Sequence, residues 1–415
     1  MKKNILFMNG AYLPKTSPNG NCVKQVLDKL FQLGHNVALI TKETDVNQKK
    51  IDNIDGVKVY RVNENILMKI IFFTDKSEKK LSKLITSFTL FLLRIKGSFF
   101  AFAYPLLSIA LVLRYYFKAK ELIRLQKFET VVAVYKSFEA VVAGVFLKRK
   151  YPQLRFIVYT LDSIAGGFIP TVLRSRKVAF DSIKRWEKLI FNYADTICVM
   201  KSHEKHYLSS EYDCYRHKIE YMDIPLLNIS NNKLKNKSNK DIDIVFTGSM
   251  ATVTANPVYF IKILKKLENI KFHIYGSISD EIQALFDYSG LIDKKIFIYG
   301  TISPNNVITV QENADILVNF GNNNPNMIPC KIFEYLSRKR PVLSFYKADS
   351  DACKFYFDNY DGVLQIFEED SELDENCDKI RDFILNLYKI KFDDEYILKR
   401  YYDNTPFPMV EEILR

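Results

Sequence analysis

The sequence is poor in the residues that build metal centres and disulfide frameworks. Its 415 residues include five histidines and six cysteines, and no Cys-x-x-Cys pair or cluster of histidine with cysteine occurs. His203 and His206 lie three residues apart, but no third ligand completes a zinc-binding spacing with them, so metal binding there is not favoured. This usage excludes the common zinc motifs and a disulfide-stapled secreted domain, and it is typical of a reducing compartment. We therefore expect a cytoplasmic protein with no metal ion and no other cofactor.

Long apolar runs are also missing. The uncharged stretch 97–113 is 17 residues long and contains Pro105, which places it at the lower limit for spanning a bilayer. The start of the chain holds only a short apolar run after two lysines, which predicts a β-strand rather than a signal peptide. With 48% hydrophobic and 26% charged residues, the composition indicates a folded protein, and the length predicts two domains.

Acidic side chains are absent from 79–120, a stretch of 42 residues with eight lysines and arginines. Aromatic and aliphatic residues are interleaved with these cations, which is typical of an amphipathic surface that binds an anionic membrane. Packing against its own domain and a membrane-spanning hairpin are the alternatives. Nucleic acid is not favoured as the partner, because the cations are mixed with continuous apolar surface and no nucleic-acid motif occurs. The bias extends over 1–240, with a net charge of +21, whereas 241–415 carries −9.

Short apolar runs alternate with helical patterns through both halves of the chain, which predicts parallel sheets covered by helices and an α/β fold. The predicted strands are 4–9, 36–41, 57–62, 130–135, 155–160 and 196–200 in the first half, and 242–247, 271–275, 295–299, 316–319 and 341–345 in the second. A helix is predicted over 21–33, with Gly34 as its C-cap and His35 in the following turn.

The polar stretch 228–240 separates these two sets of strands and predicts an exposed linker. We therefore expect an amino-terminal domain over 1–227, a carboxyl-terminal domain over 241–393, and a final segment, 394–415, whose helix crosses back to the first domain. In doubly wound sheets, ligands bind at the carboxyl ends of the strands, so the loops that follow these strands are candidate sites.

The segment 325–344 carries the strongest functional signal. Pro329 is expected to open a short helix, whose first backbone N–H groups can bind a phosphate. Glu334, one turn into this helix, can accept hydrogen bonds from the hydroxyls of a ribose. Phosphate donors beside a ribose acceptor are what a nucleotide-sugar site requires. An ordinary helix–strand unit without a ligand is the alternative.

This segment resembles the nucleotide-binding motif of GT-B glycosyltransferases, in particular the GT4-like group with a Pro-Ser-Lys-x-Phe-Glu-Tyr signature before a Pro-Val strand. The matching residues are Pro329, Lys331, Phe333, Glu334, Tyr335, Pro341 and Val342, with Cys330 in place of the usual serine. Many relatives carry a second glutamate where this sequence has Asn326. The resemblance implies the GT-B fold, in which two Rossmann-like doubly wound domains face a central cleft.

The resemblance also implies a donor pocket in the second half. Its residues would be Gly248, Ser249, Gly276 and Gly300 after three of the strands, and Asn326, Ile328, Pro329, Cys330, Lys331 and Glu334 in the motif. Glycine allows a ligand to approach the backbone closely, although a tight turn alone would also need it. No basic residue occurs in 250–261, where relatives bind the pyrophosphate. Lys331 and the amides of the helix start would then bind more of the phosphate charge, or Lys262 or Lys265 would reach the pyrophosphate. A polar loop at 319–324 is placed to cover the donor sugar.

Candidate acceptor residues follow strands of the first half. The turn at 18–21, with Gly20, resembles the family's glycine-rich loop near the reacting phosphate. Asp162 follows a predicted strand and is expected either to accept the proton of the acceptor hydroxyl or to cap a helix. Lys136 and Ser137 end the preceding strand and are expected to face the same cleft.

Two further groups of charged residues are given structural interpretations. Arg185 and Glu187 lie in the middle of a predicted helix and are interpreted as a surface pair. The triplet Asp349-Ser350-Asp351 resembles a metal-binding motif only in its spacing, and it is interpreted as a solvated loop.

The resemblance implies a retaining glycosyltransferase with Asp162, Lys331 and Glu334 as its catalytic residues. The donor would be a nucleotide-sugar, with UDP favoured, and the acceptor a polyprenyl-diphosphate-linked saccharide at the inner face of the cell membrane. Such an enzyme would act in the synthesis of a bacterial surface polysaccharide, such as a capsule or O-antigen. Two alternatives stay open: a non-catalytic membrane-associated partner of a polysaccharide assembly complex, and a GT-B-fold sugar-nucleotide epimerase.

Overall fold

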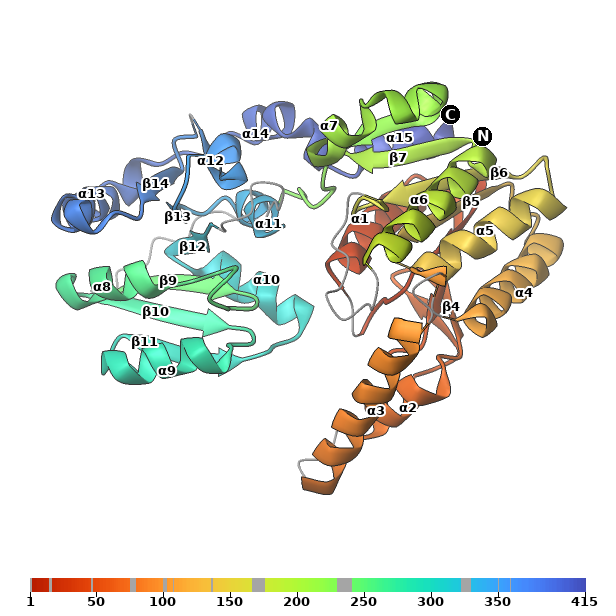
Figure 1. Ribbon diagram of the computed structural model, residues 1–415. Helices are drawn as coiled ribbons and strands as arrows, with labels where there is room; N and C mark the ends of the chain where they lie inside the picture. Colours follow the sequence, from red (N-terminus) through yellow and green to blue (C-terminus); the bar gives the residue numbers. More distant parts are fainter. Residues whose placement is uncertain are drawn as a thin grey trace. The chain divides into compact units, whose positions relative to one another are not determined.

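The chain forms two compact units, whose helices and strands are drawn in Figure 1. The amino-terminal unit consists of Met1–Pro225 together with Asp403–Arg415, and the carboxyl-terminal unit consists of Leu226–Tyr402. The computed structural model describes residues 2–14, 17–45, 48–74, 80–99, 103–106, 108–135, 137–165, 176–229, 241–321, 330–349, 351–358 and 360–415. Most of the predicted linker, 230–240, therefore lies outside the described residues.

The amino-terminal unit is built on an eight-stranded sheet with the strand order β3-β4-β2-β1-β5-β6-β7-β8. The strands are β1 (Asn4–Met8), β2 (Asn36–Lys42), β3 (Ile51–Ile54), β4 (Val57–Val62), β5 (Thr130–Tyr135), β6 (Arg155–Thr160), β7 (Thr196–Met200) and β8 (Ile219–Met222). All neighbours pair in parallel except β3, which is antiparallel to β4. The central strands are buried on both faces, which explains their continuous apolar runs.

The amino-terminal unit also contains helices, some of which cover the two faces of its sheet. They are α1 (Pro18–Gln32), α2 (Ile66–Thr74), α3 (Lys80–Phe99), α4 (Ile109–Gln126), α5 (Phe138–Lys150), α6 (Arg176–Tyr193), α7 (Glu204–Tyr207) and α15 (Phe407–Leu414). One core joins the sheet to α4, α5 and α6. A second core, formed by the opposite set of strand side chains, joins it to α1 and α15. The unit is therefore a doubly wound, three-layered domain.

The last helix, α15, is part of the amino-terminal unit although the whole carboxyl-terminal unit precedes it in the chain. Met409, Val410 and Ile413 lie in the same core as α1. The carboxylate of Glu412 is buried and lies 2.7 Å from Nη2 of Arg155 on β6, and it accepts a hydrogen bond from the hydroxyl of Thr196 on β7. Apolar packing and a buried ion pair thus both fix α15 to the sheet.

The carboxyl-terminal unit contains a six-stranded, fully parallel sheet with the order β11-β10-β9-β12-β13-β14. The strands are β9 (Ile242–Thr247), β10 (Ile270–Tyr275), β11 (Ile296–Gly300), β12 (Ile316–Phe320), β13 (Val342–Tyr346) and β14 (Val363–Phe367). The helices are α8 (Val258–Lys266), α9 (Asp280–Ser289), α10 (Pro304–Asn313), α11 (Lys331–Arg338), α12 (Ala352–Phe357), α13 (Leu373–Leu385) and α14 (Asp394–Arg400).

Two sets of helices contact this sheet through alternate side chains of its strands. Ile244 and Phe246 of β9 lie in a core shared with α8, α9 and α13. Thr247, the next residue, points to the opposite face, where it is hydrogen-bonded to Gln311 of α10 and Tyr335 of α11. The carboxyl end of β9 is therefore held against α10 and α11.

The predicted α/β fold with two doubly wound sheets is confirmed, and each predicted strand is found within one residue at either end. Sequence reasoning missed β3, β8 and β14. Each of these strands is the edge of its sheet and is partly exposed, so its residues lack the continuous apolar run on which the predictions depend.

Candidate functional site

Glycines at the carboxyl ends of β9 and β10 bring these two strands into unusually close contact. Gly248 and Gly276 have φ angles of +124° and +152°, which favour glycine. A β-carbon on Gly276 would lie 1.8 Å from the carbonyl oxygen of Gly248, so no other residue fits there without a backbone shift. Gly300, with a φ of +70°, follows the same pattern at the end of β11 but has open space around it. The predicted glycines thus lie at the carboxyl ends of three neighbouring strands of one sheet.

The side chain of Lys331 fills the space that the absent side chain of Gly248 leaves. A β-carbon on Gly248 would lie 2.3 Å from Cε of Lys331 and 2.5 Å from its Nζ. The same Nζ lies 3.8 Å from the centroid of the Phe246 ring, a cation–π contact. Burial lowers the pKa of Lys331 to about 8, while the nearby Glu334 acts in the opposite direction. The ammonium group therefore lies at the carboxyl end of β9, where doubly wound folds bind phosphates.

Lys331 is also the first residue of α11. The N–H groups of a first helical turn have no partner within the helix, and the helix dipole adds partial positive charge there. Cys330 occupies the N-cap position, and its side chain makes no capping hydrogen bond. Asn326, Ile328 and Pro329 lie outside the described residues. The described part of the motif thus offers an ammonium group and a helix start for a diphosphate.

Glu334 follows Lys331 by three residues, on the same side of α11. Burial raises the pKa of its carboxyl group, while Lys331, Arg338 and a hydrogen bond with Gln311 oppose this change. Gln311 also accepts a hydrogen bond from Nε of Arg338, at 3.2 Å, and donates one to the hydroxyl of Thr247, at 2.8 Å. These bonds join α10, α11 and β9 close to Glu334, which is itself partly buried.

Ser249 extends the predicted site along the loop after β9. Its hydroxyl accepts a hydrogen bond from that of Ser277, at 2.7 Å, and Met250 N–H donates to the carbonyl of Ser277, at 2.9 Å. The loops after β9 and β10 therefore support each other beside Gly248.

Three predictions for the carboxyl-terminal unit are wrong in part. Lys262 lies on α8 and forms an ion pair with Asp370 at 2.6 Å, so it does not replace the missing pyrophosphate-binding cation. Asn319 belongs to β12 rather than to a polar loop; it is buried, and its amide donates to Ser344. Asp351 is not solvated: it is buried and caps α12 by accepting a hydrogen bond from Cys353 N–H, while Asp349 pairs with Lys354.

The predicted acceptor residues Asp162 and Gly20 lie near each other in the amino-terminal unit. Asp162 follows β6, and its carboxylate is 3.5 Å from the amide nitrogen of Asn19, which also donates to the carbonyl of Tyr135 at the end of β5. Gly20 belongs to the first turn of α1, not to a loop, because the hydroxyl of Ser17 caps the helix by accepting from Gly20 N–H. The helix therefore begins three residues before the predicted start.

Other acceptor-side predictions have mixed outcomes. Lys136 lies outside the described residues, and Ser137 is buried at the N-cap of α5. Asp162 caps none of the described helices. The interpretation of Glu187 as half of a surface pair is wrong, because Glu187 is 1% exposed, whereas Arg185 is exposed. The pattern of α6 contained the signal, since Ile183, Ile190 and Phe191 lie three or four positions from Glu187 and are buried.

The basic, apolar stretch 79–120 divides into two parts with different surroundings. In α4, the side chains of Leu111, Val112, Tyr115 and Ala119 are buried in the core. In contrast, α3 exposes much of its apolar surface, and Figure 1 shows it side by side with α2. Among the described residues, no helix combines the length and the apolar composition needed to cross a bilayer.

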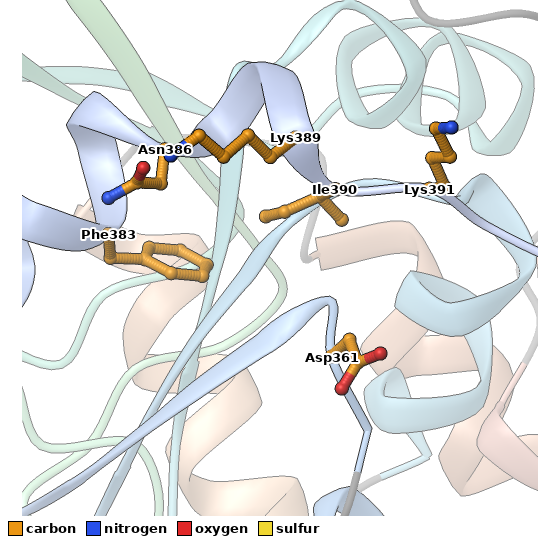
Figure 2. A pocket seen from close by; sticks show the side chains of 6 residues that line it. All are labelled: Asp361, Phe383, Asn386, Lys389, Ile390 and Lys391. Carbon is orange, nitrogen blue, oxygen red and sulfur yellow. The ribbon is translucent and has the colours of Figure 1, made fainter.

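Figure 2 shows a separate hollow of about 440 Å³ in the carboxyl-terminal unit. It is lined by Asp361, Phe383, Asn386, Lys389, Ile390 and Lys391. Asp361 precedes β14, so this hollow lies at the amino end of that strand, whereas Gly248 and Gly276 lie at carboxyl ends. It is therefore distinct from the candidate donor site.

No cluster of three histidine, cysteine or acidic side chains that would suit a metal ion occurs in the part of the chain that the structure describes.

No protein-family model matches this sequence, and no curated protein sequence does. Solved structures match it along almost the whole chain. A sucrose-phosphate synthase from Thermosynechococcus elongatus has a TM-score of 0.61 and 12% identity, covering 100% of this chain and 97% of that chain. HepE from Anabaena, in complex with UDP and glucose, has a TM-score of 0.60 and 10% identity, covering 99% and 98%. A putative UDP-N-acetylglucosamine 2-epimerase from Listeria monocytogenes has a TM-score of 0.51 and 11% identity, covering 100% and 95%.

At such low identity these matches concern the fold and not the reaction. Both units have the doubly wound topology of the matched proteins, and the match extends through both units and α15. The chain has the GT-B fold.

Proposed function

We propose that this protein is a retaining glycosyltransferase that moves a sugar from a nucleoside-diphosphate sugar, with UDP favoured, to a lipid-linked saccharide. One observation carries the donor part of the proposal. The ammonium group of Lys331 lies against Gly248 at the carboxyl end of β9, with Glu334 one helical turn away. A diphosphate at Lys331 would match its positive charge, and the hydroxyls of a ribose would donate hydrogen bonds to the carboxylate of Glu334. The complex of HepE with UDP and glucose supports UDP as the first nucleotide to test, and UDP-sugars as the first donors.

In the proposed reaction, the bond between the anomeric carbon and the diphosphate oxygen breaks, and its electron pair goes to that oxygen. Lys331 and the start of α11 stabilise the charge that develops on the leaving diphosphate. The acceptor oxygen bonds to the anomeric carbon on the face that the diphosphate leaves, so the configuration is retained, and its proton passes to the leaving oxygen. Asp162 is proposed to accept hydrogen bonds from the acceptor saccharide and so to orient it.

The lipid-linked acceptor is supported by the surface of α3. Leu81, Leu84 and Phe88 are 67%, 66% and 61% exposed, and Lys80 and Lys83 are exposed beside them. Apolar side chains enter the acyl boundary of a bilayer while lysines meet anionic headgroups. The proposed place of action is therefore the inner face of the cell membrane, with the protein attached peripherally. Synthesis of a bacterial surface polysaccharide is the proposed setting.

Binding of nucleotides tests the donor site directly. UDP, GDP, dTDP and CMP are titrated calorimetrically into the wild-type protein and into Glu334→Ala. We expect one nucleotide to bind selectively, and we expect Glu334→Ala to weaken it about 10- to 100-fold, because hydrogen bonds to a charged acceptor contribute about 1.5–3 kcal/mol each. Glu375→Ala is the control, since Glu375 lies on α13 and pairs with Lys379 at the surface.

Each other outcome points to a different function. Failure of all four nucleotides to bind would overturn the donor site and favour a non-catalytic partner of a polysaccharide assembly complex. Binding of UDP with interconversion of UDP-N-acetylglucosamine epimers, and no sugar transfer, would favour an epimerase.

Flotation with lipid vesicles tests the membrane surface. We expect the wild-type protein to float with vesicles that contain phosphatidylglycerol, and Leu84→Glu to lower the bound fraction at least tenfold, because about 2 kcal/mol of apolar burial is lost for one leucine. Leu385→Glu is a matched control: Leu385 is 69% exposed, close to the 66% of Leu84, but lies on α13. Equal flotation of all three proteins would contradict membrane attachment through α3.

A further inference from the structure

Glu187 of α6 is a buried carboxylate that the proposed reaction does not yet use. Its oxygens accept three hydrogen bonds: from the hydroxyl of Tyr212 at 2.6 Å, from that of Tyr207 at 3.3 Å, and from Ala165 N–H at 3.2 Å. Both tyrosines are almost fully buried. Burial raises the pKa of the Glu187 carboxyl group, and these hydrogen bonds oppose the change. Burying a carboxylate lowers the stability of a folded protein unless hydrogen bonds compensate. The three hydrogen bonds provide this compensation, and a role for Glu187 is therefore expected.

Two of these contacts hold the short segment that follows β6. Ala165 N–H donates directly to Glu187, three residues after Asp162. The hydroxyl of Ser163, the neighbour of Asp162, lies 3.2 Å from that of Tyr207, which itself donates to Glu187. Ser163 and Ala165 are 1% and 4% exposed. Hydrogen bonds to buried side chains therefore hold this segment at both Ser163 and Ala165.

Asp162 differs from the residues that follow it. It is partly exposed, whereas Ser163 and Ala165 are buried. Its carboxylate meets the amide of Asn19 at the carboxyl ends of β5 and β6. The hydrogen bonds toward Glu187 thus hold Ser163 and Ala165 in the interior, whereas the Asp162 side chain stays partly exposed at the carboxyl ends of β5 and β6.

We propose that Glu187 is a positioning residue that fixes the orientation of Asp162 through Ala165 N–H and the Tyr207–Ser163 pair. This inference rests on the proposed function, in which Asp162 orients the acceptor saccharide. Misplacement of an orienting group by about 1 Å lowers the rate of a reaction strongly, about 100-fold in severe cases. The carboxylate suits the task because it accepts all three bonds at once, and a neutral amide would place its N–H₂ group against one of these donors.

Glu187→Gln tests the proposal with two readouts. Hydrogen exchange of the peptide that covers 161–165 is expected to become at least tenfold faster, with little change in exchange across β7. The control is Tyr215→Phe, which removes a hydrogen bond from the hydroxyl of Tyr215 to Asn192 in the same region without touching Glu187. This control is expected to leave exchange at 161–165 unchanged.

The second readout is sugar transfer from UDP-glucose, UDP-galactose or UDP-N-acetylglucosamine to lipid-linked saccharides extracted from membranes. We expect Glu187→Gln to lower kcat about tenfold with an unchanged KM for the donor, and to have less than a twofold effect in an Asp162→Asn background. Multiplicative effects of the two changes, or unchanged exchange at 161–165, would overturn the positioning role. A wild-type protein that transfers no sugar from any donor would instead overturn the proposed function, and this inference with it.

Discussion

Lys331→Met is expected to lower kcat/KM for sugar transfer by about 10²- to 10³-fold, which corresponds to about 3–4 kcal/mol of transition-state stabilisation. Methionine keeps the apolar length of the side chain but removes the charge that lies at the carboxyl end of β9. The loss should appear in steady-state kinetics with the donor varied. The folded state should not suffer, because the buried ammonium group is itself unfavourable without its ligand.

The pH dependence gives this prediction a specific signature. Because the pKa of Lys331 is lowered to about 8, the group is cationic below that pH and becomes neutral above it. We therefore expect kcat/KM and nucleotide affinity to fall as the pH rises through about 8. A bound diphosphate stabilises the cation, so binding near pH 8.5 should take up a proton, which calorimetry in buffers of different ionisation enthalpy detects. In Lys331→Met this proton uptake should vanish.

Lys262→Met is the matched control for charge. Lys262 is on α8 and pairs with Asp370 at the surface, so its loss should leave kcat/KM and its pH profile within about twofold of the wild type. An equal loss in both variants would mean that general electrostatics, and not the position of Lys331, supports activity. Wild-type kinetics in Lys331→Met would remove Lys331 from the site.

Gly276→Ala is expected to destabilise the carboxyl-terminal unit by about 3–5 kcal/mol, among the largest effects of a single substitution. The added β-carbon would lie 1.8 Å from the carbonyl oxygen of Gly248, and backbone on both sides leaves no flexible side chain to move away. Either β9 or β10 must shift, and the hydrogen bond from Gly248 N–H to the carbonyl of Tyr275 must lengthen or break. Chemical denaturation, followed by a probe specific for this unit, measures the change.

Gly290→Ala separates the cost of the clash from that of the backbone angle. Gly290 caps α9 with a φ of +68°, and a β-carbon added there would meet no other atom within 4 Å. This substitution should therefore cost only about 1–2 kcal/mol, the usual penalty for a left-handed conformation. Equal destabilisation by the two substitutions would show that the close contact of β9 with β10 is not what requires glycine at position 276.

The central strands and the donor motif could be predicted from the sequence because their signals are local. Strand β5 consists of six buried residues in a row, four of which are valine or tyrosine flanked by charged residues, and a short β-branched run of this kind favours a buried strand. Lys331 and Glu334 belong to a short motif that the sequence displays directly. The contact of Lys331 with Gly248 could not be predicted from the sequence, because the two residues are 83 positions apart and meet only in the folded structure.

The error at Glu187 and the mixed outcome in 79–120 have a common cause. The interpretation of Glu187 equates charge with exposure, although helical periodicity places it among buried residues of α6. In 79–120 the composition favours one surface, although helical periodicity places Leu111 and Tyr115 on the buried face of α4. In both cases the period of the helix, and not the composition of the stretch, decides which side chains face the core. The hydrogen bonds that make a buried Glu187 tolerable come from Tyr207 and Tyr212, whose contribution only the tertiary structure shows.

The return of α15 to the amino-terminal unit has a consequence for the order of events during translation. The core that contains Val23 and Val26 of α1 is complete only when Met409 and Ile413 have left the ribosome. All of Leu226–Tyr402 is made in between, which takes on the order of 10–35 s at about 5–20 residues per second. The carboxyl-terminal unit, whose chain is continuous, can therefore finish folding before the unit that is synthesised first. During this interval Val23 and Val26 lack the apolar partners that α15 supplies in the finished core.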